Sequence, residues 1–573
     1  MRRSDRSNRC LLVVAGFAAL VGTLRCGAGS VGEAASRPDA TPAAAGSTAA
    51  AAASIRAGDL SRAVQALSDD AMSGRLPGTD GEEKATAWIA AQFAKIGLQP
   101  ASAGSYFQPV PLVGITADPA MTLKIAGSGE QRAFVYGKEF MGGTTRETAH
   151  IAASGDLVFV GYGTSAPEFH WDDYKGVDVS GKILVMLVND PPLADTTRFG
   201  GAAMTYYGRW TYKYEIGARK GAAGIILIHE TKAAGYPWEV VANSWSGEQF
   251  VPASADKGAS RAPFESWVTH DAAAAMFSMA GLDLADMEKK AASESFAPVD
   301  MGLTGSLAFD NTLRRVQSKN VAGLLPGGDL ADEWVIYTAH WDHLGVGNPV
   351  DGDAIYNGAF DNATGVASLL SLARAFSSLK TPPRRSVLFL AVTAEEQGLL
   401  GSTHYADHPL HPLARTAAQI NMDGMNVLGR TKDVIVIGLG NTTLDDLVEK
   451  VAHQQGRHVR PDMEPEKGFY YRSDQLPFAR KGVPALYTDH GIDYVGRPEG
   501  WGMEQNDLYT ARNYHKPSDE FDPSWDLSGM VEDTRLLFEV GRLATDADQM
   551  PRWKDGTEFK AVRARSLASV ASR

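Results

Sequence analysis

The chain has 573 residues, which is too many for one hydrophobic core, so at least two domains are expected. Hydrophobic residues make up 44% of the sequence and charged residues 21%, the ordinary balance of a folded globular protein. The formal net charge of -13 excludes the basic footprint of a nucleic-acid-binding protein and favours solubility rather than a particular partner.

The first 30 residues have the pattern of an export signal. Arg2, Arg3, Arg6 and Arg9 precede an apolar run over residues 11–21, and small residues follow at 27–29. The run is too short to serve as a permanent membrane span, although a membrane anchor or a misassigned start are alternatives. We predict a cleavable signal peptide over residues 1–30 and a mature protein that is periplasmic or secreted. Cleavage would remove five arginines and one aspartate, a net +4, and lower the formal charge from -13 to -17.

Both cysteines of the chain, Cys10 and Cys26, lie in this leader. The folded part therefore has no disulfide framework and no thiolate metal site. Lipidation of Cys26 is a minor alternative, because Arg25 directly before it fits a lipoprotein cleavage site poorly. Residues 31–54 are rich in Ala, Pro and Ser, which predicts a linker.

The next part of the chain, residues 55–147, begins with helical patterns. Leu60, Val64 and Leu67 recur at helical spacing, and a second such run extends from residue 85 to 93. Between residues 148 and 299 the pattern changes to short apolar runs broken by Gly and Pro, at 157–161, 182–188 and 224–229, with one helical run at 212–220. We interpret residues 148–299 as a small β-rich domain inserted into the first one.

From residue 300 to 548 predicted strands and helices alternate. The strand-like runs are 334–339, 386–392, 418–422, 434–437 and 484–487, and the helical runs are 366–376 and 444–454. Alternation of this kind predicts an α/β fold, a mostly parallel sheet with helices on both faces. Residues 549–573 form a short basic tail.

Imidazoles and carboxylates follow these strands. His340, Glu395-Glu396 and Asp423 each come directly after a predicted strand, and Asp361 and His515 lie in turn-like segments. Because ligands collect at the carboxyl ends of strands in α/β sheets, we expect the side chains to converge. Nitrogen and oxygen donors without sulfur suit zinc, with manganese or cobalt as possible replacements. The sequence therefore predicts a dinuclear metallohydrolase.

The residue types suggest roles within such a centre. Two divalent ions about 3.5–4 Å apart can share one carboxylate, and Asp361 is the candidate because small residues flank it. Glu395 and Glu396 should point in different directions from an extended backbone, so that one binds a metal and the other accepts a proton from water. Asp342 and Asp519 could each orient a ligating imidazole, and a helix cap is the equal alternative for Asp519.

The other histidines have weaker patterns. His343 is expected to be structural, and His490 is a less favoured ligand than His515. Tyr471 and Asp474 lie in an aromatic and polar segment that could line a substrate pocket, with ordinary packing as the alternative.

In their order along the chain, five motifs resemble the co-catalytic zinc exopeptidases, the family that includes bacterial leucyl aminopeptidases and glutamate carboxypeptidases. The motifs are His340-Trp341-Asp342, Asp361-Asn362-Ala363-Thr364-Gly365, Glu395-Glu396, Asn421-Met422-Asp423 and Tyr514-His515. The resemblance extends over residues 55–548. It implies two zinc ions, one bound by His340 and Asp423, the other by Glu396 and His515, with Asp361 between them. It also implies that Glu395 is the general base and that Asp342 is the aspartate that supports the ligand His340. The family often has a second aspartate where Asn362 stands.

The inserted region is similar to a protease-associated domain. The similarity rests on Gly155–Gly163, Trp171–Tyr174, Gly181–Ile183 and Gly221–Ile226. In relatives this domain lies near the mouth of the active site.

The resemblance implies an aminopeptidase that acts on peptides. A carboxypeptidase or dipeptidase of the same family is an alternative, and it would need cations such as Arg472 or Arg497 for the substrate carboxylate. A single-metal glutaminyl cyclase and a non-catalytic binding protein are further alternatives. Neither explains a ligand set in which no position is missing.

Overall fold

The computed structural model describes residues 42–571 apart from residues 128 and 194–197. The predicted signal peptide, its two cysteines and the start of the linker lie outside the described residues. Residues from Gly46 onward form one compact unit, to which the following description refers. Within the described ranges, no helix is both long enough and apolar enough to span a membrane.

The main sheet has four parallel strands at its centre. They are β21 (Ala485–His490), β18 (Thr416–Asn421), β14 (Leu330–His340) and β17 (Arg385–Val392), in that spatial order. All eight residues of β17 and all six of β18 are buried, as expected for parallel strands covered on both faces. On one side β19 (Asp433–Ile437) and β20 (His458–Pro461) extend the sheet. On the other side it continues through β13 (Val299–Leu325), β2 (Phe107–Ala117) and β11 (Glu248–Pro252).

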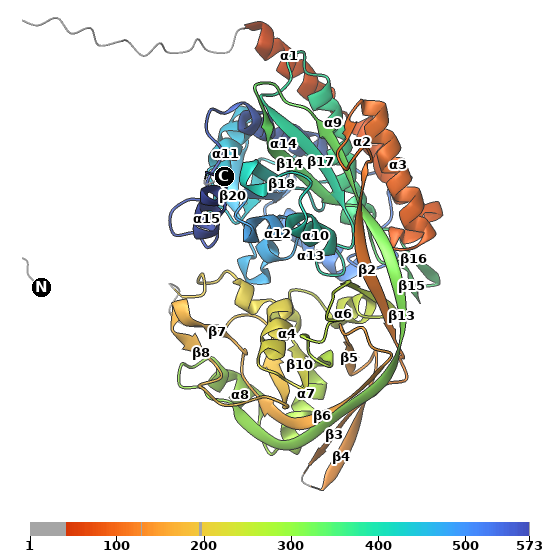
Figure 1. Ribbon diagram of the computed structural model, residues 1–573, viewed down its shortest axis with the longest axis vertical. Helices are drawn as coiled ribbons and strands as arrows, with labels where there is room; N and C mark the ends of the chain where they lie inside the picture. Colours follow the sequence, from red (N-terminus) through yellow and green to blue (C-terminus); the bar gives the residue numbers. More distant parts are fainter. Residues whose placement is uncertain (1–41, 128, 194–197, 572–573) are drawn as a thin grey trace, which may run out of the picture. The chain divides into compact units, whose positions relative to one another are not determined.

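Helices cover both faces of this sheet (Figure 1). One shared core contains α2 (Ala57–Leu67), α3 (Asp80–Ile96), α9 (Thr364–Ser377), α11 (Leu444–Gln454) and α14 (Ser528–Asp546). Residues of α10 (Leu400–Asp407) and α12 (Gln475–Arg480) pack in a second cluster with β17. The predicted α/β fold is therefore confirmed.

β13 links the main sheet to a second one. This strand of 27 residues pairs with β2 and β17 in the main sheet and with β6 (His150–Phe159) and β3 (Thr122–Gly127) in the second. Figure 1 shows β2 and β13 running side by side from one sheet to the other. The remaining strands of the second sheet are β4 (Glu130–Val135), β5 (Phe140–Gly143), β9 (Ile183–Leu187), β10 (Gly224–His229) and β12 (Glu265–Thr269).

We call residues 118–310 the insert, because the N–H of Asp118 donates to the carbonyl of Asp310 where the chain leaves and rejoins the main sheet. One core of the insert involves α7 (His270–Met279) and α8 (Leu284–Ala291). Another involves α4 (Trp210–Arg219), α5 (Thr231–Ala234) and α6 (Trp238–Ser244). These cores contain residues from Met121 to Phe309, beyond both predicted boundaries at 148 and 299.

Two segments are more ordered than the sequence suggested. α1 (Pro42–Ala53) is helical inside the predicted linker, because its run of alanines has high helix propensity, and Ala51 is buried. The C-terminal tail carries α15 (Lys560–Ala571) and buries Trp553 and Phe559. Smaller elements are β1 (Gln99–Pro100), β7 (Ser165–Ala166), β8 (Trp171–Asp172), β15 (Gly345–Val350), β16 (Asp353–Tyr356), α13 (Trp501–Arg512) and the short turns η1 (Asp70–Arg75) and η4 (Ala359–Ala363).

Candidate metal centre

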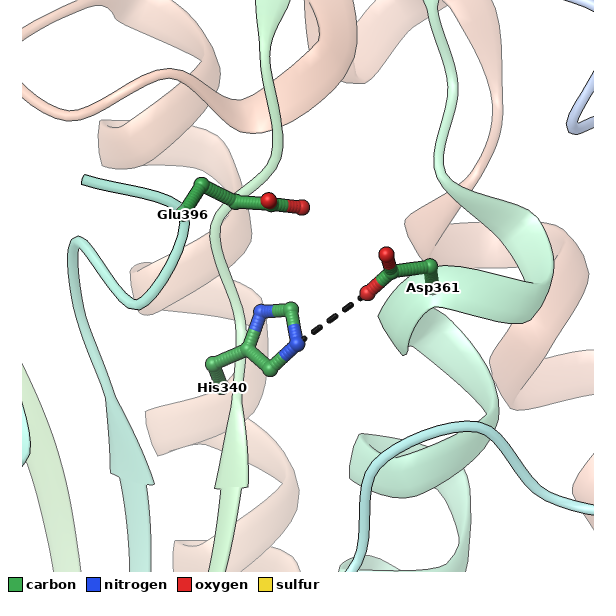
Figure 2. Close-up of side chains that lie close together, drawn as sticks. All are labelled: His340, Asp361 and Glu396. Atoms are coloured by element: carbon green, nitrogen blue, oxygen red, sulfur yellow. Dashed lines mark ion pairs between the residues drawn. The ribbon is translucent and has the colours of Figure 1, made fainter. Parts of the chain in front are cut away.

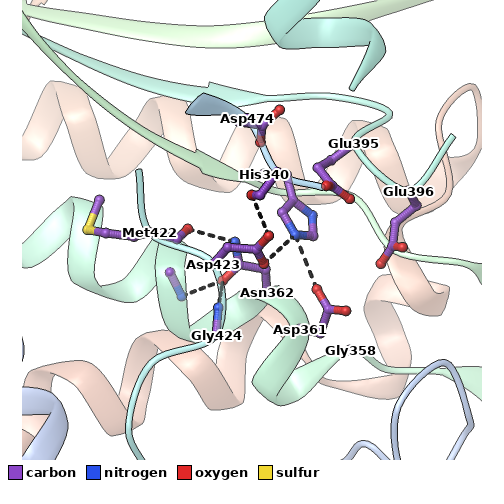
Figure 3. Close-up of polar contacts among 12 residues, drawn as sticks. His340, Gly358, Asp361, Asn362, Glu395, Glu396, Met422, Asp423, Gly424 and Asp474 are labelled. Atoms are coloured by element: carbon purple, nitrogen blue, oxygen red, sulfur yellow. Dashed lines mark hydrogen bonds and ion pairs between the residues drawn. The ribbon is translucent and has the colours of Figure 1, made fainter. Parts of the chain in front are cut away.

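The loops at the carboxyl ends of three parallel strands bring the predicted acids and imidazoles together. His340 is the last residue of β14, Glu395 and Glu396 follow β17, and Asp423 follows β18. Asp361 lies in η4 just before α9, and His515 lies between α13 and α14. Figures 2 and 3 show the side chains of His340, Asp361 and Glu396 directed at one another from separate segments of the chain, and Figure 3 adds Glu395 and Asp423.

The five expected ligands form two pairs on either side of Asp361. Asp361 Oδ1 lies 3.1 Å from His340 Nε2, which is also 3.1 Å from Asp423 Oδ1. Asp361 Oδ2 lies 3.6 Å from His515 Nε2, which is 3.0 Å from Glu396 Oε2. We call His340 with Asp423 the first pair and Glu396 with His515 the second pair. Each pair faces its own oxygen of Asp361.

This arrangement fits divalent metal ions. Ligand atoms of His340, Asp361 and Glu396 lie within 4.8 Å of one another. His515 Nε2 is buried and makes no hydrogen bond, although two carboxylates face it. A buried polar atom without a partner is costly, and a metal ion would supply one. The set of imidazole and carboxylate donors suits zinc.

Opposing effects shift the pKa values of these groups. Burial lowers the pKa of His340, but the charges of Asp423 and Glu395 raise it well above its usual value overall. Burial also lowers the pKa of His515, yet Glu396 and Asp361 raise it to about 10. Burial raises the pKa of Glu396, while His515 and His343 bring it down to about 2. The carboxylates therefore favour positive charge between them, which protons on the imidazoles or divalent cations can provide.

The turn that carries Asp361 is held by two other side chains. The two carboxylate oxygens of Asp519 accept the N–H groups of Phe360 and Asp361, each at 3.0 Å. Asp519 thus neither orients His515 nor caps a helix, contrary to both expectations. Asn362 Nδ2 donates to the carbonyl of Met422, while its Oδ1 accepts from Gly365 N and Gly424 N. An aspartate at position 362 could not make the first of these bonds, because an ionised carboxylate donates no hydrogen bond.

Asp342 differs in part from its expected role. His340 Nδ1 lies 3.2 Å from the main-chain oxygen of Asp342 but 3.9 Å from its carboxylate, too far for a hydrogen bond. The carboxylate instead accepts the N–H of Glu395 at 3.1 Å. Burial raises the pKa of Asp342 to about 8. Asp342 therefore positions both His340 and Glu395, one through its backbone and one through its side chain.

The backbone at the glutamate pair is not extended, and that prediction was wrong. Ala394 has a left-handed φ of 51°, and the N–H groups of Gly398 and Leu399 both donate to the carbonyl of Glu395. The turn places Glu395 and Glu396 beside each other near His340 (Figure 3). Burial raises the pKa of Glu395 well above its usual value, and the charges of Asp423 and Glu396 add to that rise.

His343, expected to be merely structural, belongs to the site. Its Nδ1 is a hydrogen-bond partner of Glu396 Oε1, and its ring lies edge-on to that of His515. Its place three residues after His340, at the end of the same strand, was the available signal. His490 is held by Asp489 and by Asn506, and no contact joins it to the two pairs.

A cavity of about 1180 Å³ opens onto this centre, and residues of both the insert and the main domain line it. Tyr471 is part of its wall and donates to Glu558 Oε2 at 3.1 Å. Asp474 is fully buried and accepts from Ser402 Oγ, so it lies behind the wall rather than on it. Arg472 lines the cavity, whereas Arg497 stacks on Trp501 elsewhere.

Residues 320–538 match the model of Peptidase family M28. A probable zinc metalloprotease of Pyrenophora teres f. teres is 36% identical over 108 residues, which are 19% of this chain and 23% of that protein. Aminopeptidase YwaD of Bacillus subtilis is 33% identical over 108 residues, 18% of this chain and 21% of that protein. The chain thus matches less than a quarter of the length of these curated relatives.

Among solved structures, an aminopeptidase from Aneurinibacillus sp. strain AM-1 shares the fold. The TM-score is 0.53 at 21% identity, and the alignment covers 88% of this chain and 97% of that one. The chain therefore has an α/β fold, and its residues 320–538 are similar to metallopeptidases. The match of residues 320–538 to the model of Peptidase family M28 confirms the resemblance to zinc exopeptidases. The likeness of the insert to a protease-associated domain stays a prediction.

Proposed function

We propose that the protein is a zinc aminopeptidase with two metal ions, which removes residues from the N-terminal end of peptides. The observation that carries this proposal is the position of Asp361, whose two oxygens each face one histidine and carboxylate pair. His340, Asp423 and Asp361 would hold one ion, and Glu396, His515 and Asp361 the other. The relatives named aminopeptidase or zinc metalloprotease support the same activity.

Bound zinc ions would supply Lewis-acid chemistry, lowering the pKa of water and polarising the scissile carbonyl. Glu395 would accept the proton of the attacking water and pass it to the leaving amine. Its burial suits this task, since a raised pKa makes a carboxylate a stronger base. Asp342 would keep Glu395 in place through the backbone N–H that it accepts.

The test is a time course of one unblocked peptide with the zinc-loaded protein, followed by mass spectrometry. We expect residues to be lost from the N-terminal end and N-acetylation to stop the reaction. Loss from the C-terminal end would replace the aminopeptidase by a carboxypeptidase. An uncut peptide would favour a dipeptidase, a glutaminyl cyclase or a binding protein.

A second candidate, an enzyme that binds a substrate carboxylate, has one specific observation in its favour. Arg209 of the insert lines the cavity, is buried, and has an Nε without a hydrogen-bond partner. Burial lowers its pKa to about 10, and the nearby charge of Arg472 contributes to the shift. Two guanidinium groups on one wall suit a free carboxylate. C-terminal amidation of the peptide distinguishes the candidates, because it should abolish carboxypeptidase activity and spare aminopeptidase activity.

We also propose that the protein is exported to the periplasm or the medium. The insert would be a protease-associated domain near the mouth of the cavity. N-terminal sequencing of the protein recovered from these fractions tests export. A mature chain that begins near residue 31 is expected, whereas a full-length chain in the cytoplasm would contradict it.

A further inference from the structure

The insert reaches the second pair through one continuous segment. After α6, strand β11 of the insert joins the edge of the main sheet beside β2. The N–H of Phe250 in β11 donates to Gln397 Oε1 at 3.1 Å, directly after the Glu395-Glu396 turn. Gln249 Nε2 donates to the carbonyls of Ser244 and Ser246 and so fixes the connection between α6 and β11.

His515 is held by the end of α6. Ser244 Oγ lies 2.8 Å from His515 Nδ1, while Nε2 of the same ring faces Glu396 and Asp361. Asn243 Nδ2 donates to the main-chain carbonyl of His515 at 3.2 Å. Tyr514 packs against a core cluster of the insert. When Nε2 binds a metal, Nδ1 carries the proton, so Ser244 Oγ would accept it.

The conformation of His515 requires such support. Its φ of 55° lies in the left-handed region, which is unfavourable for a residue other than glycine and persists where surrounding contacts impose it. Contacts from Asn243 to the backbone and from Ser244 to the ring satisfy this requirement.

Within the described residues, no comparable hydrogen bond or ion pair joins the first pair to the insert. His340 Nδ1 is satisfied by the main-chain oxygen of Asp342, and Asp423 Oδ2 accepts from Ser473 Oγ. Both partners belong to the main domain. The two pairs are therefore supported from different parts of the chain.

We infer that Ser244 and Asn243 are positioning residues for His515, so that the insert sets the affinity of the metal at the second pair alone. This inference rests on the proposed function, because it assumes two metal ions. Loss of a group that orients a ligating histidine typically weakens metal binding about 10–100-fold. The effect should fall on one ion of two.

The test is zinc binding by the full chain, measured by competition with a chromophoric chelator and by metal analysis. We expect wild type to bind two ions, and Ser244→Ala to bind one as tightly as before and the other about 10–100-fold more weakly. Ser244→Thr should restore the second ion because it keeps the hydroxyl. Ser246→Ala is the matched control, since Ser246 Oγ donates to the Asn243 carbonyl and does not contact His515.

Double variants assign the weakened ion. In His515→Ala the ion at the first pair remains, and adding Ser244→Ala should not change its affinity. In Asp423→Ala the ion at the second pair remains, and adding Ser244→Ala should lower its affinity. Ser473→Ala should instead lower the affinity for zinc at the first pair. Thermal melting of each variant verifies that it is folded.

The outcomes distinguish a failure of this inference from a failure of the proposed function. Wild type with two ions and Ser244→Ala unchanged, or with both ions weakened equally, overturns the inference alone. Wild type with fewer than two ions overturns the proposed dinuclear function and, with it, this inference.

Discussion

At the scale of single residues, the centre depends on how each carboxylate is restrained. Asp361 is fixed from behind by Asp519, which accepts the N–H of Asp361, and by Asn362, which bonds the loop after β18. Glu395 is fixed through its backbone by Asp342. Within the described part of the chain, its side chain makes no hydrogen bond and no ion pair, which leaves it available for proton transfer. The backbone is thus restrained at both Asp361 and Glu395, while the Glu395 side chain stays free to exchange a proton.

Substitution of Glu395 should separate binding from turnover. Because general acid and base catalysis contributes about 10²–10⁴-fold, Glu395→Gln should lower kcat by that factor. Its metal content should stay that of wild type, since glutamine keeps the shape of the side chain and none of the five ligands changes. The measurement combines peptide turnover with metal analysis. Glu449→Gln, at an exposed position of α11, is the control for a glutamate lost elsewhere. Full turnover in Glu395→Gln would remove this residue from its role.

At the scale of elements, the short turn η1 joins the two loops that carry His340 and Asp361. The buried guanidinium of Arg75 donates to the carbonyls of Trp341, Asn357 and Gly358, at 2.6–2.9 Å. Burial lowers its pKa to about 10, so Arg75 stays charged at neutral pH near the site carboxylates. Gly74 allows this approach, since its φ is 64° and a Cβ would lie 2.4 Å from the carbonyl oxygen of Gly345.

Removal of Arg75 should therefore destabilise the fold. Arg75→Met leaves buried carbonyls unpaired and removes a buried charge, a change that typically costs about 3–5 kcal/mol. Arg75→Lys should recover part of this loss because it keeps the charge without the planar set of donors. The free energy of unfolding in urea measures both. Arg62→Met, at an exposed position of α2, should change the free energy of unfolding by less than about 0.5 kcal/mol. A change equally small in Arg75→Met would contradict the role of η1.

Glu265, a buried residue of strand β12 in the insert, should make the stability of the protein depend on pH. Burial raises the pKa of Glu265 from 4.5 to about 7, against opposing effects of Thr145, Arg261 and Arg146. A carboxyl whose folded pKa exceeds its unfolded pKa contributes stability that is complete below the unfolded value and is lost as pH rises through the folded value. Wild type should therefore lose stability relative to Glu265→Gln between about pH 5 and pH 8.

Melting temperatures of wild type and Glu265→Gln at several pH values measure this difference. Subtracting one curve from the other cancels the titration of the shared metal-site groups. The difference should be near zero or favour wild type at the acidic end and favour Glu265→Gln at the basic end. Parallel curves would show that the pKa of Glu265 is not raised.

At the scale of the whole molecule, the sequence predicted what local patterns encode. The apolar runs of β14 and β17 and the periodicity of α11 were located to within a few residues, and the site residues followed from strand ends. β13 was missed as one strand of 27 residues because exposed residues interrupt its alternating pattern, four of them in succession at 312–315. The contacts of Ser244 and Asp519 could not be predicted, since each depends on a partner far away in sequence.

The position of the cavity between the insert and the main domain leads to a prediction about substrates. Its walls include Arg209 and Trp245 of the insert together with Tyr471 and His515, and the ligands beneath it are largely buried. A peptide end must therefore enter this cavity to reach Glu395. If the proposed aminopeptidase activity holds, an N-terminal sequence fused directly to a folded domain should be trimmed more than about tenfold more slowly than the free peptide, a difference of about 1.4 kcal/mol. A flexible Gly/Ser linker before the domain should restore the rate, because it lets the peptide end extend into the cavity. The ratio of kcat/KM for the three substrates is the measurement, and equal values would show that the walls of the cavity do not restrict access.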